Sequence, residues 1–258
     1  MTETLSSAAS PRDLVNLRDL GGIAVHGGRI RPGLLWRSDD AARITTSGAA
    51  ALVGRGLTSI VDLRSVEELA LTGRGPLAGH GVVHHHLPLL DTTTSPLELR
   101  ELLETSGDTP RTVGAWYAQL ALDRAEVLVA GLRVVAEAPG AVLFHCAAGK
   151  DRTGIFAAAV LSTLGASLED IAADYALTHP AMPQILERLA DVPTPWVPSG
   201  GLTSDGTSAL LGAPAATMRH MLEVLEIDHG GFAAVLAAGG LGPRLRAELA
   251  QRLVVESA

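Results

Sequence analysis

The stretch HCAAGKDRTG, residues 145–154, constrains the fold of this chain more than any other ten residues. It is polar, yet it lies between the apolar runs 141–144 and 155–160. This order predicts a buried strand, a tight turn and the first turn of a helix. Backbone N–H groups in such a turn point inward and the helix N-terminus adds positive potential, so the turn is suited to binding an anion.

The same stretch contains the only cysteine, Cys146, and the only lysine, Lys150; all other residues among the 20 Lys and Arg are arginines. A cysteine surrounded by amide donors, a helix N-terminus and cationic side chains is expected to be a thiolate at neutral pH. In an anion-binding turn, such a thiolate is a nucleophile directed at a phosphorus atom.

Two nucleotide-binding patterns are excluded here. The nucleotide P-loop requires a glycine where Phe144 stands, and a serine or threonine where Asp151 stands. The dinucleotide pattern G-x-G-x-x-G does not occur in the chain. The anion held by this turn is therefore not expected to be a nucleotide bound in either way.

Length and composition indicate a globular protein with one large α/β domain or two small ones, and they exclude several classes of partner. The chain has 258 residues, of which 47% are hydrophobic and 19% charged, so it can bury a large core. A net charge of −8 opposes binding to nucleic acid and to anionic membranes. An anionic substrate must then be held by a local site.

Cysteine use and the first residues bear on location. A single cysteine excludes an internal disulfide and argues against structural zinc, so we expect a reducing compartment and no metal or cofactor. The start, MTETLSSAAS, lacks the pattern of a signal peptide, and no run of about 18 apolar residues predicts a membrane span. These features predict a cytoplasmic protein; its oligomeric state stays open.

Strand and helix patterns alternate along the chain, which predicts a single α/β domain over residues 11–258 after a disordered terminus at 1–10. Strands are expected at 34–36, 58–63 and 82–87. Helices are expected after caps at 45–47 and 95, over 112–138, 151–164, 167–177 and 182–190, and from 215 onward. Residues 178–214 contain six prolines around one short helix, so we expect them to form a cover or lid.

The order His145, Cys146, five residues and then Arg152-Thr153-Gly154 resembles the signature loop of the cysteine-dependent protein tyrosine phosphatase superfamily. Its interior, Ala-Gly-Lys-Asp-Arg, is most similar to the bacterial tyrosine/lipid phosphatases, an atypical dual-specificity branch. Further stretches agree with that family: NLRDLGG (16–22), LLWRS (34–38), IVDLRSVEE (60–68), LPLLD (87–91) and DYALTHP (174–180).

The resemblance implies a central, mostly parallel sheet flanked by helices, with a helical or loop lid. It also implies hydrolysis of phosphomonoesters through a phosphocysteine, without metal. Cys146 would attack phosphorus, and Arg152 would hold two phosphoryl oxygens with its planar fork. Thr153 would hydrogen-bond the cysteine sulfur, and His145 would shape the loop. The phosphate-binding residues are expected to be Ala147, Ala148, Gly149, Lys150, Asp151, Arg152 and Thr153.

Two residues are candidates for the general acid that protonates the leaving oxygen. Asp151 is favoured by similarity to the matching aspartate of the family, and Asp91 is the second candidate because it follows a strand and a proline in LPLLD. The spacing does not decide between them. Lys150 points to extra negative charge in the substrate, such as a phosphoinositide, or to stabilisation of the leaving group.

Other polar residues are interpreted as structural. Arg18, Asp19, Arg37 and Asp62 are expected to form buried ion pairs and hydrogen bonds near the site. The three histidines 84–86 suggest a metal site, but neighbouring side chains of a strand point to opposite faces and do not converge on one ion.

Competing functions are a phospho-binding pseudophosphatase and a sulfurtransferase or arsenate reductase. The second group usually needs further cysteines, which this chain lacks. The expected partners are a phosphorylated protein or a phosphoinositide as substrate and inorganic phosphate in the loop. The choice among phosphotyrosine, phosphoserine, phosphothreonine and lipid substrates stays open.

Overall fold

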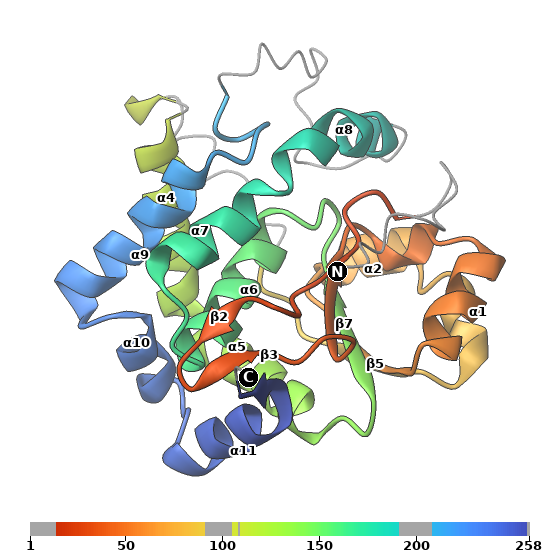
Figure 1. Cartoon of the computed structure of the whole chain (residues 1–258). Helices are drawn as coiled ribbons and strands as arrows, with labels where there is room; N and C mark the ends of the chain where they lie inside the picture. The colour runs from red at the N-terminus through yellow and green to blue at the C-terminus, as the bar shows by residue number, and fades with distance from the viewer. Residues whose placement is uncertain (1–13, 91–104, 108, 191–207, 257–258) are drawn as a thin grey trace.

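A five-stranded sheet forms the centre of the molecule in the computed structural model, which describes residues 14–90, 105–107, 109–190 and 208–256 (Figure 1). Its strand order is β1-β4-β7-β5-β6. The strands are β1 (Arg18–Asp19), β4 (Leu35–Ser38), β7 (Ala141–His145), β5 (Leu57–Asp62) and β6 (Val83–His86). Only β1 runs antiparallel to its neighbour, which confirms the predicted, mostly parallel sheet.

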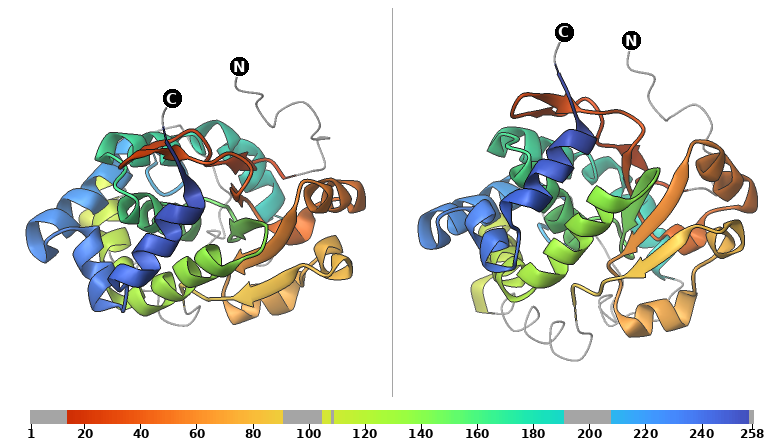
Figure 2. Two further views of the ribbon diagram at one scale, coloured as in Figure 1. Left: turned by 60° about the horizontal axis from the view of Figure 1, so that its bottom comes forward. Right: turned by 90° about the horizontal axis from the view of Figure 1, so that it is seen from below.

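Both faces of this sheet are buried, because its central strands are apolar at successive positions. Successive side chains of a strand point to opposite faces. In β7, Val142 and Phe144 join the larger apolar core, whereas Ala141 and Leu143 join a smaller core on the other face. Figure 2 shows the helices that cover the two faces. A strand buried on both sides belongs to the interior of a parallel sheet, as the continuous apolar pattern indicates.

The smaller core lies under α1 (Thr46–Gly54) and the short 3₁₀ helix η3 (Pro76–His80). The hydroxyl of Thr45 accepts a hydrogen bond from the Gly48 amide and caps α1, as the sequence predicts. After β5 the chain enters α2 (Val66–Thr72), where Ser65 and Glu68 form a reciprocal capping box. This cap fixes the start of α2 next to the carboxyl end of β5.

The larger core is covered by helices on the other face of the sheet. These are α4 (Pro110–Asp123), α5 (Ala125–Glu137), α6 (Asp151–Thr163), α7 (Leu168–Ala176), α9 (Ala215–His229), α10 (Phe232–Ala238) and α11 (Pro243–Leu253). In Figure 1, α6 lies behind α7 among these helices, and every residue of α6 from Arg152 to Leu161 is buried. Because α6 begins directly after the polar loop, the packing of this helix fixes one end of that loop.

One expected helix is divided. The sequence predicts continuous helical spacing over 112–138, but the chain leaves the helix at Arg124, where φ is −120°. The break lets α4 pack against α9 while α5 packs against α6 and α11. Gly114 permits the close approach of α4 and α9, since a Cβ there would lie 2.6 Å from the Thr217 carbonyl oxygen. Both halves are apolar on one side, so periodicity alone does not reveal the break.

A second, antiparallel sheet consists of β2 (Ala24–Val25), β3 (Gly28–Ile30) and β8 (Val254–Val255). It pairs the last described strand with one of the first. The short helix α8 (Met182–Ala190) has the predicted bounds and follows the 3₁₀ turn η4 (His179–Ala181). The expected disorder of residues 1–10 and the helix start at residue 95 fall outside the described residues. In the described part of the chain, no helix combines the length and apolar character needed to cross a membrane.

Candidate active site

The polar loop 146–150 lies at the carboxyl end of β7, between the ends of its two neighbours. Because β4, β7 and β5 are parallel, the residues that follow all three strands meet at one edge of the sheet. On one side, the Asp40 amide donates to the Ala147 carbonyl over 3.1 Å. On the other side, the Leu63 amide donates to the His145 carbonyl over 2.9 Å. The loop is therefore held from both flanks.

Gly149 sets the path of the loop. Its φ is +67°, and a Cβ there would lie 2.3 Å from the Ser38 carbonyl oxygen, so only glycine fits. Its own carbonyl accepts from Asn16 Nδ2 and Arg37 Nη2, both over 2.9 Å. Among the described residues, no acceptor is paired with the amides of residues 147–150. An anion-binding loop requires unpaired amides of this kind, so the loop's role as the phosphate site stays a prediction.

Cys146 begins this loop, and its side chain is buried with 1% exposure. The hydroxyl of Thr153, in the first turn of α6, donates to Cys146 Sγ over 3.2 Å. A hydroxyl donor stabilises negative charge on sulfur.

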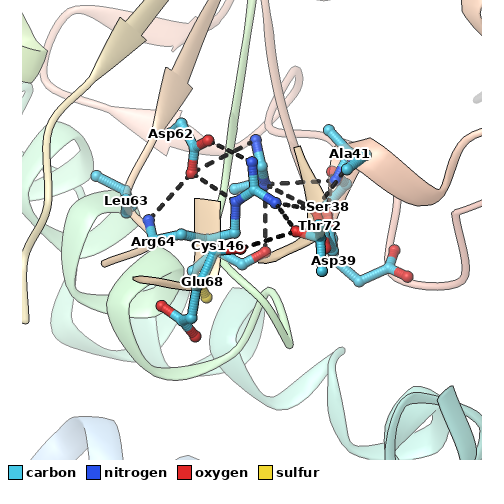
Figure 3. Close-up of polar contacts among 12 residues, drawn as sticks. Ser38, Asp39, Ala41, Asp62, Leu63, Arg64, Glu68, Thr72 and Cys146 are labelled. Carbon is cyan, nitrogen blue, oxygen red and sulfur yellow. Dashed lines mark hydrogen bonds and ion pairs between the residues drawn. The ribbon is translucent and has the colours of Figure 1, made fainter. Parts of the chain in front are cut away.

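Arg152 is held by Glu68 from α2. Both terminal guanidinium nitrogens bind the carboxylate, Nη2 to Oε1 over 2.8 Å and Nη1 to Oε2 more closely. Burial alone would raise the pKa of Glu68, but the charge and hydrogen bonds of Arg152 outweigh it and hold that pKa below its ordinary value. Figure 3 shows Glu68 beside Cys146, together with Arg64 and Asp62. A bidentate pair of this kind fixes the plane of the arginine fork.

Glu68 was not among the site residues predicted from the sequence. A signal was present, because Ser65-x-x-Glu68 directly after a strand has the spacing of a capping box. The cap explains why this glutamate is oriented: one oxygen, Oε2, accepts from the Ser65 amide over 2.7 Å. Its contact with Arg152 spans 84 residues, and no local pattern indicates such a pair.

Lys150 is buried, and its amine turns toward the segment that follows α8. Lys150 Nζ donates to the carbonyl oxygen of Leu210 and lies 3.2 Å from Asp151 Oδ1. The same Asp151 oxygen accepts a hydrogen bond from the Tyr117 hydroxyl. The side chains of the predicted site residues Lys150 and Asp151 are thus in contact at the start of α6. The partners Tyr117 and Leu210 carried no signal in the sequence.

Behind Cys146 lies a second charged cluster (Figure 3). Arg64 donates to Asp62 with Nε over 2.9 Å and Nη2 over 2.6 Å, and to Asp40 with Nη1 over 2.9 Å. His145 lies next to this cluster, and its Nδ1 accepts a hydrogen bond from the Ala41 amide over 3.3 Å. Burial lowers the pKa of His145, so the ring is neutral at pH 7. These contacts hold His145 beside the start of the loop, and its role in shaping the loop stays a prediction.

Two of the three consecutive histidines point to one face of β6. His84 Nε2 donates to Asp62 over 3.0 Å, and His86 Nε2 donates to the Arg64 carbonyl over 2.8 Å. Their rings stack with centroids 6.3 Å apart. Within the described ranges, no group of His, Cys, Asp and Glu has the arrangement of a metal site.

A third charged cluster supports the other flank. Asp174 from α7 accepts from Arg18 Nε over 2.9 Å and from Arg37 Nη1. Burial would raise the pKa of Asp174, but the two arginines hold it below its ordinary value. Asp19 instead accepts from the Gly21 amide over 2.8 Å. Arg37 and Asp62 thus form the buried ion pairs expected from the sequence. Arg18 and Asp19 are half-buried, and Asp19 binds backbone amides.

The described parts of the segment 178–214 contact the loop region at several points. Arg188 of α8 donates to Asp39 Oδ2 over 3.1 Å. The Thr178 hydroxyl accepts from Arg18 Nη2 over 3.2 Å. Burial raises the pKa of Asp39 to about 6.

The second acid candidate, Asp91, lies outside the described residues.

The family of this chain follows from the geometry of the site together with comparison with known proteins. The model of a tyrosine phosphatase family matches residues 10–255. The chain therefore belongs to the tyrosine phosphatase family, and the predicted enzyme class is confirmed.

Individual relatives agree with this membership. A triple specificity protein phosphatase of Mycobacterium tuberculosis is 32% identical over 207 residues, which cover 69% of this chain and 71% of that protein. A putative tyrosine-protein phosphatase of Cupriavidus necator is 36% identical over 166 residues, covering 62% and 59% of the two chains. A tyrosine-protein phosphatase of Nostoc commune is 30% identical over 143 residues, covering 55% and 47%.

Proposed function

We propose that this tyrosine phosphatase acts through a covalent phosphocysteine at Cys146. In the first half of the reaction, Cys146 Sγ forms a bond to phosphorus while the bond from phosphorus to the leaving oxygen breaks. Arg152 and the loop amides hold the phosphoryl oxygens, which gain charge in the transition state. Asp151 gives its proton to the leaving oxygen, so the alcohol or phenol departs neutral.

In the second half, a water molecule attacks phosphorus and the S–P bond breaks. The Asp151 carboxylate takes one proton from this water, and the electron pair of the broken bond returns to sulfur. The Thr153 hydroxyl, 3.2 Å from Sγ, stabilises the departing thiolate. Inorganic phosphate is then released, and both Cys146 and Asp151 have returned to their starting states.

The observation that carries this proposal is the placement of Cys146 at the start of an amide-lined loop, with Thr153 on its sulfur and Arg152 fixed by Glu68. The test is phosphate release from 4-nitrophenyl phosphate in the presence of a chelator, comparing the wild type with Cys146→Ser. We expect turnover to fall by about 1,000-fold or more. Turnover retained by the serine variant would exclude the covalent mechanism, as would failure to trap a phosphorylated Cys146 by mass spectrometry.

Asp151 is proposed as the general acid, with Asp91 as the alternative. An acid matters most when the leaving group is a poor one. Asp151→Asn is therefore expected to reduce kcat/KM for phenyl phosphate by about 100-fold and kcat/KM for 4-nitrophenyl phosphate far less. If Asp151→Asn slows both substrates equally while Asp91→Asn discriminates between them, the acid role belongs to Asp91.

The proposed substrates are phosphotyrosine, phosphoserine and phosphothreonine proteins and phosphoinositides. The mycobacterial relative supports this breadth, because its name describes a triple specificity protein phosphatase. Lys150 supports an additional anionic group, provided that its amine exchanges the Leu210 carbonyl for the substrate. A panel of phosphopeptides and phosphoinositides, assayed with wild type and Lys150→Met, tests this. A larger loss with phosphoinositides than with phosphotyrosine is expected, and equal losses would remove Lys150 from substrate selection.

We further propose that the segment 178–214 covers the phosphate loop as a lid within a single domain spanning 11–258. The support is the contact of Arg188 with Asp39 and of Leu210 with Lys150. Limited proteolysis with and without vanadate tests the lid: slower cutting within 178–214 is expected when vanadate occupies the loop. Equal cutting in both conditions would contradict it.

A cytoplasmic location is also proposed, because a catalytic thiolate needs a reducing compartment and the chain has no second cysteine. Fractionation of cells that produce the tagged protein tests this. Recovery outside the cytoplasmic fraction would contradict the proposal.

A further inference from the structure

Two buried tyrosines from different helices lead to the proposed general acid. Tyr117 lies on α4 and Tyr175 on α7, with side chains 0% and 1% exposed. Their hydroxyl oxygens are 2.9 Å apart, and the Tyr117 hydroxyl contacts Asp151 Oδ1. The two rings meet edge to face with centroids 6.1 Å apart. Three helices therefore converge on one carboxyl group.

The direction of the hydrogen bonds in this chain follows from the number of protons. The Tyr117 hydroxyl has a single proton and donates it to the Asp151 carboxylate, so its oxygen accepts from the Tyr175 hydroxyl. Burial, and then the negative charge of Asp151, raise the pKa of Tyr117 well above its ordinary value. Burial likewise raises the pKa of Tyr175. Both hydroxyls keep their protons at any working pH, and Tyr117 remains a donor throughout.

The contacts distinguish the two oxygens of Asp151. Oδ1 faces two donors, the Tyr117 hydroxyl and, at 3.2 Å, Lys150 Nζ. Among the described residues, none donates a hydrogen bond to Asp151 Oδ2, and the side chain is 25% exposed. An oxygen that already accepts from two donors is a poor place for a proton. The transferable proton of Asp151 therefore belongs on Oδ2.

Gly154 makes room for this arrangement. A Cβ at this position would lie 2.8 Å from Tyr175 Cδ2 and 3.1 Å from Tyr175 Cε2, closer than side chains approach each other. The absence of a side chain one turn into α6 lets the Tyr175 ring lie against the helix that carries Asp151. The tyrosine pair is thus packed against the catalytic loop.

We propose that Tyr117, supported by Tyr175, is a positioning residue that fixes the orientation of the Asp151 carboxyl so that Oδ2 delivers the proton to the leaving oxygen. The inference rests on the proposed function, in which Asp151 is the general acid. Neither tyrosine touches the substrate. Removing one hydroxyl leaves the rings and their packing in place, so Tyr→Phe variants test the orientation itself.

The experiment measures kcat/KM for phenyl phosphate and 4-nitrophenyl phosphate with Tyr117→Phe, Tyr175→Phe and Asp151→Asn, singly and in combination. This constant reports the steps up to formation of the phosphocysteine, in which the leaving oxygen is protonated. Tyr117→Phe is expected to slow phenyl phosphate by about tenfold and 4-nitrophenyl phosphate by less than about twofold. Tyr175→Phe is expected to slow phenyl phosphate by about threefold. In the Asp151→Asn background, Tyr117→Phe should add less than about twofold, since the group it orients is absent.

Equal slowing of both substrates by Tyr117→Phe, or undiminished slowing in the Asp151→Asn background, overturns the positioning role. If Asp151→Asn itself does not discriminate between the substrates, the proposal falls with the acid assignment. The covalent function is separate, because it fails only if Cys146→Ser keeps turnover. Thermal unfolding checks that each variant is folded, and Tyr175→Phe carries the same test if Tyr117→Phe does not fold.

Discussion

Arg152 and Lys150 are two buried cations of the same loop, yet the protein holds them in different ways. Arg152 is bound at both terminal nitrogens by the carboxylate of Glu68, which a helix cap fixes in turn. Lys150 binds a neutral carbonyl, that of Leu210, and is 3.2 Å from Asp151. A full charge compensates the first cation, whereas a dipole and a shared carboxyl compensate the second.

This difference separates a permanent part of the site from a part that depends on the cover. The partner of Arg152 belongs to α2, beside the central sheet, so the guanidinium is oriented before any substrate arrives. The partner of Lys150 belongs to the segment after α8, and α8 itself contacts the core through Arg188 and Asp39. Movement of that segment would release the lysine and leave the arginine in place.

The largest effect is expected from exchanging the arginine. Arg152→Lys should reduce kcat/KM for 4-nitrophenyl phosphate by about 1,000-fold, because an ammonium group has no planar fork to bind Glu68 and phosphate together. Lys150→Met should reduce it by about tenfold. Steady-state kinetics on the two variants measures these losses. Equal reductions in kcat/KM would contradict the difference between the two cations.

Removing the charge of Glu68 should destabilise the fold. Glu68→Gln leaves the buried Arg152 uncompensated, which costs about 3 kcal/mol in the free energy of unfolding. The control is Glu169→Gln, because Glu169 and Arg219 form an exposed ion pair whose loss should cost less than about 1 kcal/mol. Urea denaturation measures both. If Glu68→Gln lowers the free energy of unfolding no more than Glu169→Gln does, the charge of Glu68 does not compensate the buried Arg152.

A methyl group at Gly149 should disturb the loop without touching either cation. Gly149→Ala places a Cβ 2.3 Å from the Ser38 carbonyl oxygen at a φ of +67°, so we expect a loss of about 2 kcal/mol in the free energy of unfolding. Gly27→Ala is the control, because Gly27 also has a positive φ but no atom within 4 Å of its added Cβ. Urea denaturation of both variants isolates the contribution of the steric clash to the free energy of unfolding. Equal losses of stability in the two variants would contradict a clash at Gly149.

The smallest predicted effect is a pH dependence of the free energy of unfolding. This dependence differs between Asp39, which contacts α8, and Glu68, which binds Arg152. The pKa of Asp39 is raised from 3.8 to about 6, so the folded state binds this proton more tightly than the unfolded chain. Stability from Asp39 is therefore lost as pH rises, by about 1 kcal/mol between pH 5 and pH 7. Glu68 has a lowered pKa, so its contribution is present above about 4.5 and stays nearly constant in that window.

Asp39→Asn is the variant that checks this. The difference between the free energies of unfolding at pH 5 and pH 7 should change by about 1 kcal/mol relative to the wild type. Urea denaturation at the two pH values gives the result. An unchanged difference would mean that Asp39 does not titrate in this range and that its contact with Arg188 has the same strength at both pH values.

The sequence predicted the features that depend on local pattern. The apolar runs predicted β4, β5 and β7. The polar stretch 145–154 predicted the loop between β7 and α6 that contains Cys146, Arg152 and Thr153. The sequence also predicted the bounds of α8. These features depend on residues that are neighbours in the chain, for which periodicity and turn chemistry are sufficient signals.

The partners of the loop residues could not be predicted in this way. Glu68, Tyr117 and Leu210 contact the loop across 84, 34 and 60 residues. Each has an ordinary local explanation, as a capping residue, a helix aromatic and a loop leucine. The break at Arg124 was missed for a similar reason, because the apolar spacing continues across it. Long-range pairing is decided by packing, and one sequence carries little record of it.

The single thiol has a practical consequence. Because Cys146 is the only cysteine and is 1% exposed, any thiol-specific reagent that labels the native protein reports on this one position. The labelling rate then measures how often Cys146 becomes accessible to bulk water, and a bound oxyanion should lower that rate. The wild-type protein is its own single-site probe, and no engineered cysteine is required.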